Sequence, residues 1–159
     1  MKINKIDLDI INFLQVDGRM SCTEIAERIG NITERAVRYR LKRLTQEGVI
    51  QVTAIVHPKA LGYNVVADVF VEVEPGHIDE VARQLLTYVP VTYVACSIGE
   101  NDISLQVVGH SNEEIYRFVT EVVGRIPAVR RTNTSIVPVT LKDVYQWKVP
   151  EDTSVSEKV

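Results

Sequence analysis

The chain has 159 residues, of which 45% are hydrophobic and 25% are charged, and its formal net charge is −3. It contains no run of about 18 apolar residues, the length that a membrane-spanning helix requires, and its N-terminus lacks the apolar core of a signal peptide. Two isolated cysteines, Cys22 and Cys96, form neither a disulfide framework nor a zinc motif. We therefore expect a globular cytoplasmic protein without a membrane partner.

Charge is distributed unequally between the two halves of the chain. Residues 1–62 hold ten Lys/Arg and seven Asp/Glu, whereas residues 63–159 hold eight and fourteen. The first half is therefore basic and the second acidic, although the net charge of the whole chain argues against a nucleic-acid partner. This asymmetry predicts two modules with different partners.

The N-terminal part of the chain predicts three short helices. Apolar residues recur at helical spacing over Ile6–Leu14, and Asp17-Gly18 ends this first segment. Ser21 is a candidate N-cap for a second helix, and Gly30 supplies a sharp turn before the third. Three short helices, the last two joined by a tight turn that contains glycine, predict a helix-turn-helix.

The third helix, Thr33–Glu47, has an unusual charge pattern. Thr33 is its expected N-cap, and Gly48 can close it in the left-handed conformation. Five basic residues and no acidic residue occupy the stretch from Arg35 to Arg43, although mixed signs would stabilise a solvated helix through i,i+4 pairs. The helix is either an ordinary surface helix with a chance basic run or one whose outer face meets phosphate.

The rest of the chain predicts a second module built mainly from strands. Val49–Val56 is rich in β-branched residues and predicts a strand, and Pro58 and Gly62 then mark the module boundary. The following elements are an alternating strand Val65–Val73, a helix Ile78–Leu86, a strand Val91–Ile98, a turn Gly99–Asp102, a strand Ile103–Val108, a helix from Ser111 to Ile126 and a strand Arg130–Val139. Residues 149–159 are polar and aperiodic and predict a loose tail.

This order of elements predicts the fold class. It is α+β, with an N-terminal (winged) helix-turn-helix joined to a C-terminal ferredoxin-like βαββαβ sandwich that has an antiparallel sheet.

Short motifs at characteristic spacings extend over residues 3 to 142. In the first module they are Ile6-Asp7, Phe13-Leu14-Gln15, Asp17-Gly18-Arg19, residues 25–30, Val37, residues 40–44 and Gly48-Val49-Ile50. In the linker and the second module they are Pro58, Leu61-Gly62, residues 99–102, Ile126-Pro127 and Thr132-Asn133-Thr134. This ordered set resembles the Lrp/AsnC (leucine-responsive/asparagine regulator, or feast/famine) family of transcription regulators.

The resemblance implies a sequence-specific DNA-binding transcription regulator, not an enzyme, with no cofactor. Its parts would be residues 1–50 (helix-turn-helix), 51–63 (strand and linker), 64–142 (ferredoxin-like effector-binding and dimerisation domain) and 143–159 (C-terminal extension and tail). The implied partners are double-stranded DNA, a small-molecule effector such as an amino acid, and further copies of the chain. The family commonly forms homodimers that assemble into octamers or other higher oligomers.

One departure from the family pattern lies just before the third helix. The family usually places one apolar residue between the glycine and the capping Ser or Thr. Here Asn31 and Ile32 separate Gly30 from Thr33. The third helix is therefore expected to start or tilt differently.

The resemblance makes the third helix the DNA-recognition helix, which enters the major groove with its N-terminal half nearest the bases. Arg35, Arg38 and Tyr39 are candidates for base edges, and Lys42 and Arg43 for phosphate. Arg40 could instead brace the module through an internal carboxylate such as Asp7 or Asp17. The full set of candidate DNA-binding residues is Ser21, Thr23, Thr33, Arg35, Arg38, Tyr39, Arg40, Lys42 and Arg43. Ser21 and Thr23 could equally be simple helix caps.

The turn Gly99–Asp102 has two readings. Gly and Asn are good hairpin residues by themselves, whereas the resemblance places an amino-acid effector near this turn, in a cleft between dimers. Backbone N–H groups around Gly99 would hold the effector carboxylate, and Asp102 or Glu100 its ammonium group. The full set of candidate effector-binding residues is Ser97, Gly99, Glu100, Asn101, Asp102, Thr132 and Thr134.

Dimerisation is also expected on physical grounds. A four-stranded sheet with both helices on one face leaves its other face to be covered, and pairing two sheets by a two-fold axis would cover it. Tyr145 and Trp147, after the last strand, would pack either on the helix-turn-helix module or on a neighbouring subunit.

Two other functions remain as alternatives, an enzyme of the haem-pathway decarboxylase type and a DNA-independent amino-acid sensor. The enzyme would need histidine and arginine pairs on a cofactor carboxylate, but Arg130 and Arg131 have no neighbouring histidine. His57, His77 and His110 lie near predicted element ends, away from the cysteines, so we expect no metal site.

Overall fold

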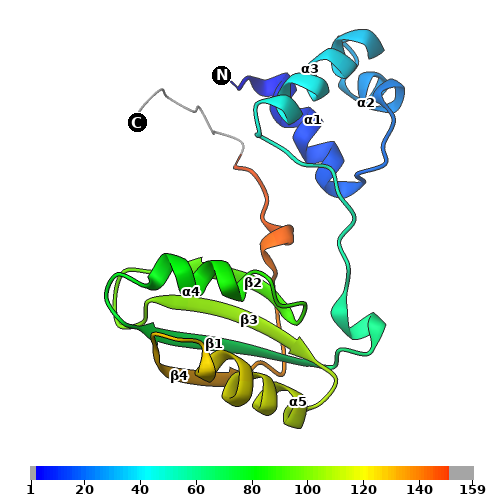
Figure 1. Ribbon diagram of the computed structural model, residues 1–159. Coiled ribbons are helices and arrows are strands. Elements are labelled where there is room, and N and C mark those ends of the chain that lie inside the picture. Colours follow the sequence, from blue (N-terminus) through cyan, green and yellow to red (C-terminus); the bar gives the residue numbers. More distant parts are fainter. Residues whose placement is uncertain (1–2, 151–159) are drawn as a thin grey trace. The chain divides into compact units, whose positions relative to one another are not determined.

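The computed structural model describes residues 3–150, which form two compact units (Figure 1). The first unit contains the chain up to Ile55 and again from Lys142, and the second unit is Val56–Leu141. The chain therefore passes from the first unit into the second and returns to the first unit at Lys142. Within residues 3–150, every helix is too short or too polar to cross a membrane.

The first unit contains the three predicted helices, α1 (Lys5–Val16), α2 (Cys22–Ile29) and α3 (Glu34–Gln46). Each begins at a polar N-cap whose side chain accepts the backbone N–H three residues on, as predicted for Ser21 and Thr33. Six largely buried residues from the three helices and the α1–α2 loop form their shared core: Ile10, Ile11, Met20, Ile25, Val37 and Leu44.

The prediction of a strand over Val49–Val56 is wrong. Residues 50–57 have no regular secondary structure, and the side chains of 51–57 are exposed. The β-branched composition favours an extended backbone, but a strand is stabilised only when a neighbouring strand pairs with its N–H and C=O groups. Within residues 3–150 the four-stranded sheet consists of other segments, and this stretch has no pairing partner.

The second unit has the predicted ferredoxin-like order of strands and helices. Its elements are β1 (Val65–Val73), α4 (Ile78–Leu85), β2 (Val91–Cys96), β3 (Ile103–Gly109), α5 (Asn112–Arg117) and β4 (Val129–Ile136). A 3₁₀ turn, η1 (Pro58–Leu61), precedes β1, and the last helix continues from α5 through a π turn, η2 (Phe118–Val122), and a 3₁₀ turn, η3 (Val123–Arg125). The strands pair antiparallel in the order β2-β3-β1-β4, so β4 is an edge strand.

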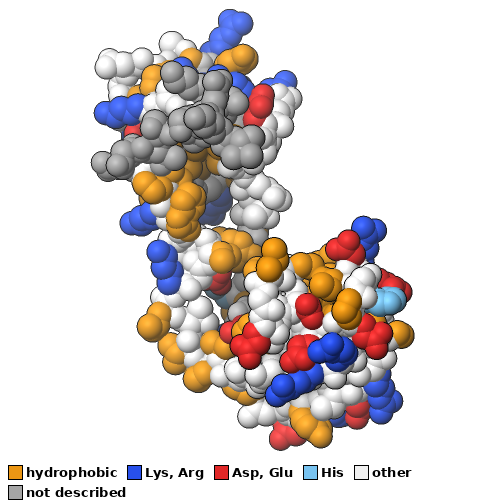
Figure 2. Space-filling view, turned by 90° about the vertical axis from the view of Figure 1, so that its left-hand side faces the viewer, with side chains coloured by type: hydrophobic (Ala, Val, Ile, Leu, Met, Phe, Trp, Pro, Cys, Tyr) orange, Lys and Arg blue, Asp and Glu red, His pale blue; other side chains and the backbone are white. Residues whose placement is uncertain are grey.

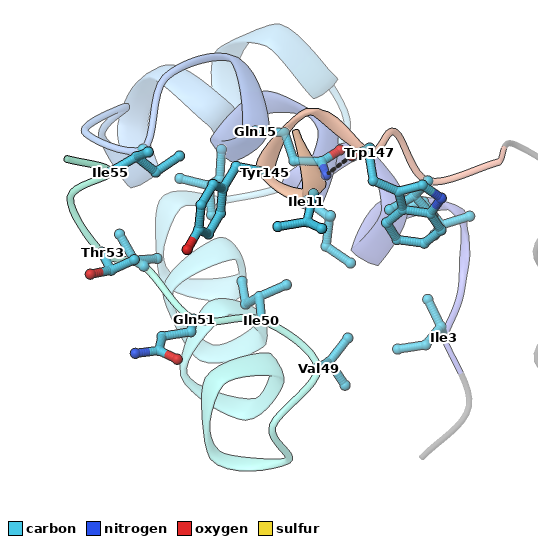
Figure 3. Close-up of a pocket in the computed structure, with 16 residues that line it drawn as sticks. Ile3, Ile11, Gln15, Val49, Ile50, Gln51, Thr53, Ile55, Tyr145 and Trp147 are labelled. Carbon is cyan, nitrogen blue, oxygen red and sulfur yellow. Dashed lines mark hydrogen bonds between the residues drawn. The ribbon is translucent and has the colours of Figure 1, made fainter. Parts of the chain in front are cut away.

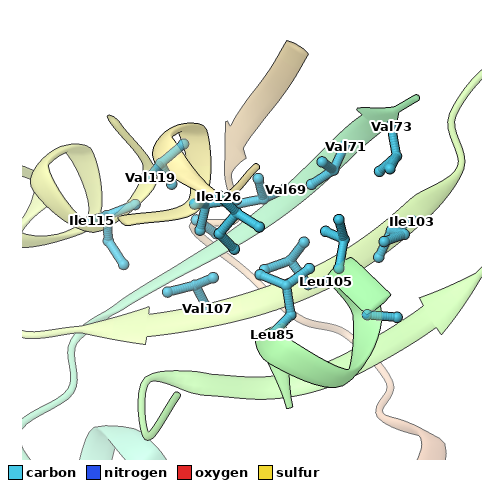
Figure 4. Close-up of a cluster of buried hydrophobic side chains, with 14 residues drawn as sticks. Val69, Val71, Val73, Leu85, Ile103, Leu105, Val107, Ile115, Val119 and Ile126 are labelled. Carbon is cyan, nitrogen blue, oxygen red and sulfur yellow. The ribbon is translucent and has the colours of Figure 1, made fainter. Parts of the chain in front are cut away.

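The core of the second unit lies between the sheet and its helices (Figure 4). Alternate residues of β1, from Ala67 to Val73, are buried, as the alternating pattern predicts. They meet Leu85 of α4 and Ile115 of α5, so both helices cover the same face. Leu86 was expected on the apolar side of its helix but is 67% exposed, because α4 ends at Leu85.

Candidate functional site

The outward face of α3 is basic. Arg35, Arg38, Tyr39 and Lys42 are all exposed, and their spacing of i, i+3, i+4 and i+7 places them on one stripe of the helix. Val37 and Leu44 on the opposite side are fully buried. On the face drawn in Figure 2, the charged side chains visible on the first unit are mostly basic, whereas acidic and basic side chains are interspersed on the second.

Glu34 holds Arg38 at the start of this stripe. The two side chains form an i,i+4 ion pair. The bond from Arg38, and secondarily the nearby Thr23 hydroxyl of α2, lowers the pKa of Glu34, and the same carboxylate raises the pKa of Arg38. The Arg38 side chain nevertheless remains 70% exposed. Sequence reasoning missed this pair, although its spacing was a signal for it.

Arg40 and Arg43 face α1 instead of solvent. Their guanidinium groups donate to the two carboxylate oxygens of Asp7, at 2.8 and 3.0 Å. Asp7 is completely buried and also accepts the backbone N–H of Asn4 at 3.1 Å. The expected brace by Arg40 is therefore present. Arg43, which we assigned to phosphate, is held by the same buried carboxylate.

The start of α2 offers exposed hydroxyls. Ser21 Oγ accepts the backbone N–H of Glu24 at 3.1 Å, so its capping role is realised. The Thr23 side chain is exposed and helps to lower the pKa of Glu34, and Thr33 caps α3 by accepting from the Ala36 N–H at 3.2 Å. Each of these candidate residues therefore has a structural role of its own.

The candidate effector loop is longer than the predicted four-residue turn. It runs from Ser97 to Asp102 between β2 and β3, and is closed by the Ser97 N–H donating to the Asp102 carbonyl at 2.8 Å. Ser97, Gly99 and Glu100 are exposed, whereas Asn101 and Asp102 are half-buried. Gly99 has φ +150°, which a glycine adopts without strain.

Asp102 joins this loop to an irregularity in the sheet. The β1–β4 register shifts between Glu72 and Val73. Asp102 Oδ2 accepts the Val73 N–H at 2.7 Å, and the Asp102 N–H donates to the Val71 carbonyl at 3.1 Å. One carboxylate oxygen therefore has a structural role at the β-bulge.

The structure brings only some of the candidate effector residues together. Thr132 and Thr134 of β4 lie opposite Val71 and Val69, so β1 separates them from the Ser97–Asp102 loop, which bonds to β1 from the β3 side. Neither the cavity beside α1 nor the cavity beside α5 is lined by a candidate effector residue. Ser97, Gly99, Glu100 and Thr134 are exposed, whereas Asn101, Asp102 and Thr132 are half-buried.

Two of the three histidines contact other side chains. His110 stacks on Tyr63, and His77 contacts Glu80. Among residues 3–150, no group of three or more His, Cys, Asp or Glu side chains could hold a metal ion.

A three-helix module with a basic outward face, joined to an antiparallel α/β sandwich, defines a two-module DNA-binding regulator. Two family models agree with this class: a winged helix-turn-helix DNA-binding domain matches residues 3–51, and the Lrp/AsnC ligand binding domain matches residues 66–147. The chain belongs to the Lrp/AsnC family of transcription regulators.

Individual relatives agree with this assignment. An uncharacterized HTH-type transcriptional regulator of Pyrococcus horikoshii is 36% identical over 148 residues, which cover 92% of this chain and 90% of the relative. The HTH-type transcriptional regulator FL11 of Pyrococcus furiosus is 37% identical over 136 residues, covering 85% and 89%. The family and these relatives are transcription regulators, which disfavours the enzyme alternative.

Solved structures share the fold. AsnC of Escherichia coli superimposes with a TM-score of 0.82 at 22% identity, covering 89% of this chain and 95% of AsnC. A transcriptional regulator of Neisseria meningitidis in complex with L-Met superimposes with a TM-score of 0.85 at 23% identity, covering 94% and 97%. At these identities the likeness concerns the fold alone.

Proposed function

We propose that this regulator recognises its operator through the outward stripe of α3. The observation that supports this most directly is the exposure of Arg35, Arg38, Tyr39 and Lys42 on one face. In a helix-turn-helix the recognition helix lies in the major groove, where arginine can donate two bonds to guanine. Arg35, Arg38 and Tyr39, in the N-terminal half, are assigned to base edges, and Lys42 to phosphate.

The remaining basic residues of α3 have a different role in this proposal. Arg40 and Arg43 are held by the buried Asp7 and fix α3 against α1. Ser21 and Thr23 lie at the start of α2, where hydroxyl and backbone N–H groups can donate to a phosphate.

The test is a DNA titration of Arg38→Ala against Arg83→Ala. Arg83 is an exposed arginine of α4 in the second unit and controls for loss of one positive charge. The operator is first selected from random duplexes with the wild-type protein. Loss of a bidentate base contact costs about 1–3 kcal/mol, a roughly 5- to 150-fold weaker operator complex. Equal affinity and equal sequence preference of the two variants would remove Arg38 from the interface.

We further propose that the effector is an amino acid bound at the Ser97–Asp102 loop. The match to a ligand binding domain supports an effector, and the L-Met complex of the Neisseria regulator supports an amino acid. Glu100 is exposed, and one oxygen of Asp102 has no bond in the described structure, so both can accept from an ammonium group. Thr132 and Thr134 supply hydroxyl groups on β4.

The effector site in this proposal is completed by oligomerisation. Among the described residues of the second unit, no element covers the sheet face away from α4 and α5, which contains the half-buried Phe70 and the 52% exposed Tyr93. We assign this face to a homodimer interface, in which a second copy covers Phe70 and Tyr93. Assembly of dimers into octamers or other higher oligomers would then enclose the open Ser97–Asp102 loop.

Two measurements test the effector and the assembly. Calorimetry with each proteinogenic amino acid compares the wild type with Glu100→Gln and Asp102→Ala. Asp102→Ala also removes the bond to Val73, so a melting curve of this variant serves as the control for its stability. Equal binding heats in all three proteins would remove both carboxylates from the site. Sedimentation of Phe70→Lys should show a smaller species than the wild type, and a monomeric wild type would refute the dimer.

A further inference from the structure

The segment 142–149, here called the C-terminal arm, belongs to the first unit. It contains a short 3₁₀ turn, η4 (Val144–Gln146). Gln15 of α1 donates through Nε2 to the backbone carbonyl of Trp147 at 2.8 Å, across 132 residues of sequence (Figure 3). Val149 packs against the core of the three helices. The C-terminal arm is therefore docked on the DNA-binding module of its own chain.

The docking surface is an apolar groove that the C-terminal arm fills only in part. A cavity of about 480 Å³ remains between α1, residues 49–55 and the C-terminal arm, and Ile3, Ile11 and Ile50 are among its mostly aliphatic lining residues (Figure 3). Val144, Tyr145 and Trp147 are 72%, 62% and 58% exposed. A segment with such partial burial detaches more readily than the helices beneath it, because the stability of a contact follows the apolar area that it buries.

The candidate effector loop and the C-terminal arm are connected through strands β1 and β4. Asp102 bonds to Val73 at the point where the register between β1 and β4 shifts. β4 pairs with a neighbour on one side only, so it can shift more easily than an inner strand. Just after β4, the Val137 N–H still donates to the Val66 carbonyl at 2.8 Å, and the C-terminal arm begins five residues later.

We propose that the C-terminal arm transmits effector binding from β4 to the DNA-binding module. In the docked state it gives the module a second covalent connection to the sheet, in addition to residues 56–64. An effector that contacts the Ser97–Asp102 loop or Thr132 changes the position of β4. Because the C-terminal arm follows β4 in the chain, this change either shifts α1 through the docked arm or releases the arm from its groove. This inference rests on the proposed effector site, because it assigns the route by which that site acts.

The first test measures the ratio of DNA affinities with and without amino acid. It compares the wild type with a chain that stops after Leu141 and a control chain that stops after Pro150, using L-methionine and then each other amino acid as the probe. We expect the shorter chain to bind amino acid by calorimetry and DNA by anisotropy, but with an affinity ratio near one. The control chain should keep the wild-type ratio.

Different outcomes refute different claims. If the chain that stops after Leu141 keeps the wild-type ratio, the C-terminal arm has no part in coupling while the effector site stands. If amino acids bind the wild type without changing its DNA affinity, the coupling proposal fails and the binding site stands. If no amino acid binds the wild type, the effector site and the coupling proposal fail together.

The second test needs no ligand and no truncation. Trp147 is the single tryptophan of the chain, so intrinsic fluorescence reports the state of the C-terminal arm directly. Gln15→Ala removes the bond to the C-terminal arm and should shift the emission to longer wavelength, increase quenching by iodide and move the affinity ratio toward one. The matched control is Gln84→Ala, whose side chain bonds to Tyr88 in the second unit. A Gln15→Ala protein with control-like emission and ratio overturns the proposal.

Discussion

Replacing Asp7 by Asn tests whether one buried carboxylate holds the recognition helix in place. Asn has nearly the shape of Asp, so the change removes the negative charge without leaving a cavity. Asp7 is 0% exposed, and its oxygens accept from Arg40 at 2.8 Å and from Arg43 at 3.0 Å. In the variant both guanidinium groups lose their counter-charge, and the new amide N–H₂ donors face them.

The expected cost follows from burial. Breaking a buried ion pair by removing one partner costs about 3–5 kcal/mol. The Arg40 and Arg43 side chains are 24% and 32% exposed, so they regain some hydration when the carboxylate charge is lost. We therefore expect about 3 kcal/mol, at the low end of that range. For a module of this size, such a loss lowers the melting temperature by roughly 12–24 °C.

Differential scanning calorimetry of the full chain measures this loss. The matched control is Asp9→Asn, which removes one negative charge from the same helix outside the pair. We expect the transition of the first unit to move and that of the second unit to stay. If Asp7→Asn melts at the temperature of Asp9→Asn, the buried pair does not stabilise the module and our account of Arg40 and Arg43 is wrong.

Three further outcomes are expected. Gly109→Ala should lower stability by about 1–3 kcal/mol in urea unfolding, because the added Cβ would lie 2.9 Å from Ile115 Cδ1 in the core. Thr33→Ala should cost about 1 kcal/mol in the same assay, because it removes the N-cap of α3. The lowered pKa of Glu34 means that its pair with Arg38 is intact above the ordinary pKa of a glutamate and is lost as the pH falls through the lowered value. Arg38→Ala should raise the Glu34 pKa toward the ordinary value in an NMR titration; an unchanged pKa would contradict the pairing.

Local patterns predicted most of the fold. The alternation of Val65–Val73 placed the buried face of β1 correctly, and the caps Ser21 and Thr33 fixed the starts of α2 and α3. These features depend on interactions within a few residues, so they can be predicted from the local sequence. The prediction of a strand over Val49–Val56 was wrong because a strand depends on a distant pairing partner. Composition favours an extended backbone in this segment, but it does not reveal whether such a partner exists.

The details of the site depended on contacts between distant residues. The family resemblance assigned Arg43 to phosphate, but the carboxylate that holds it lies 36 residues away in α1. The residue types of Gly99–Asp102 correctly predicted a turn between two hairpin strands, but they gave no sign of the bond from Val73 to Asp102, which spans 29 residues. The sequence left the place of Trp147 open, and its bond with Gln15 decides for the module of its own chain. Of the expected tail, 151–159 lie outside the described residues.

The return of the chain to the first unit makes the second unit an insertion within the first. A single proteolytic nick between residues 56 and 64 would leave the two fragments attached, because residues 142–150 would still anchor the inserted unit to α1. A fragment that ends at Ile55 would lack Trp147 and Val149 and would expose the groove that they cover. The DNA-binding unit is therefore complete only after the last strand of its neighbour has been synthesised.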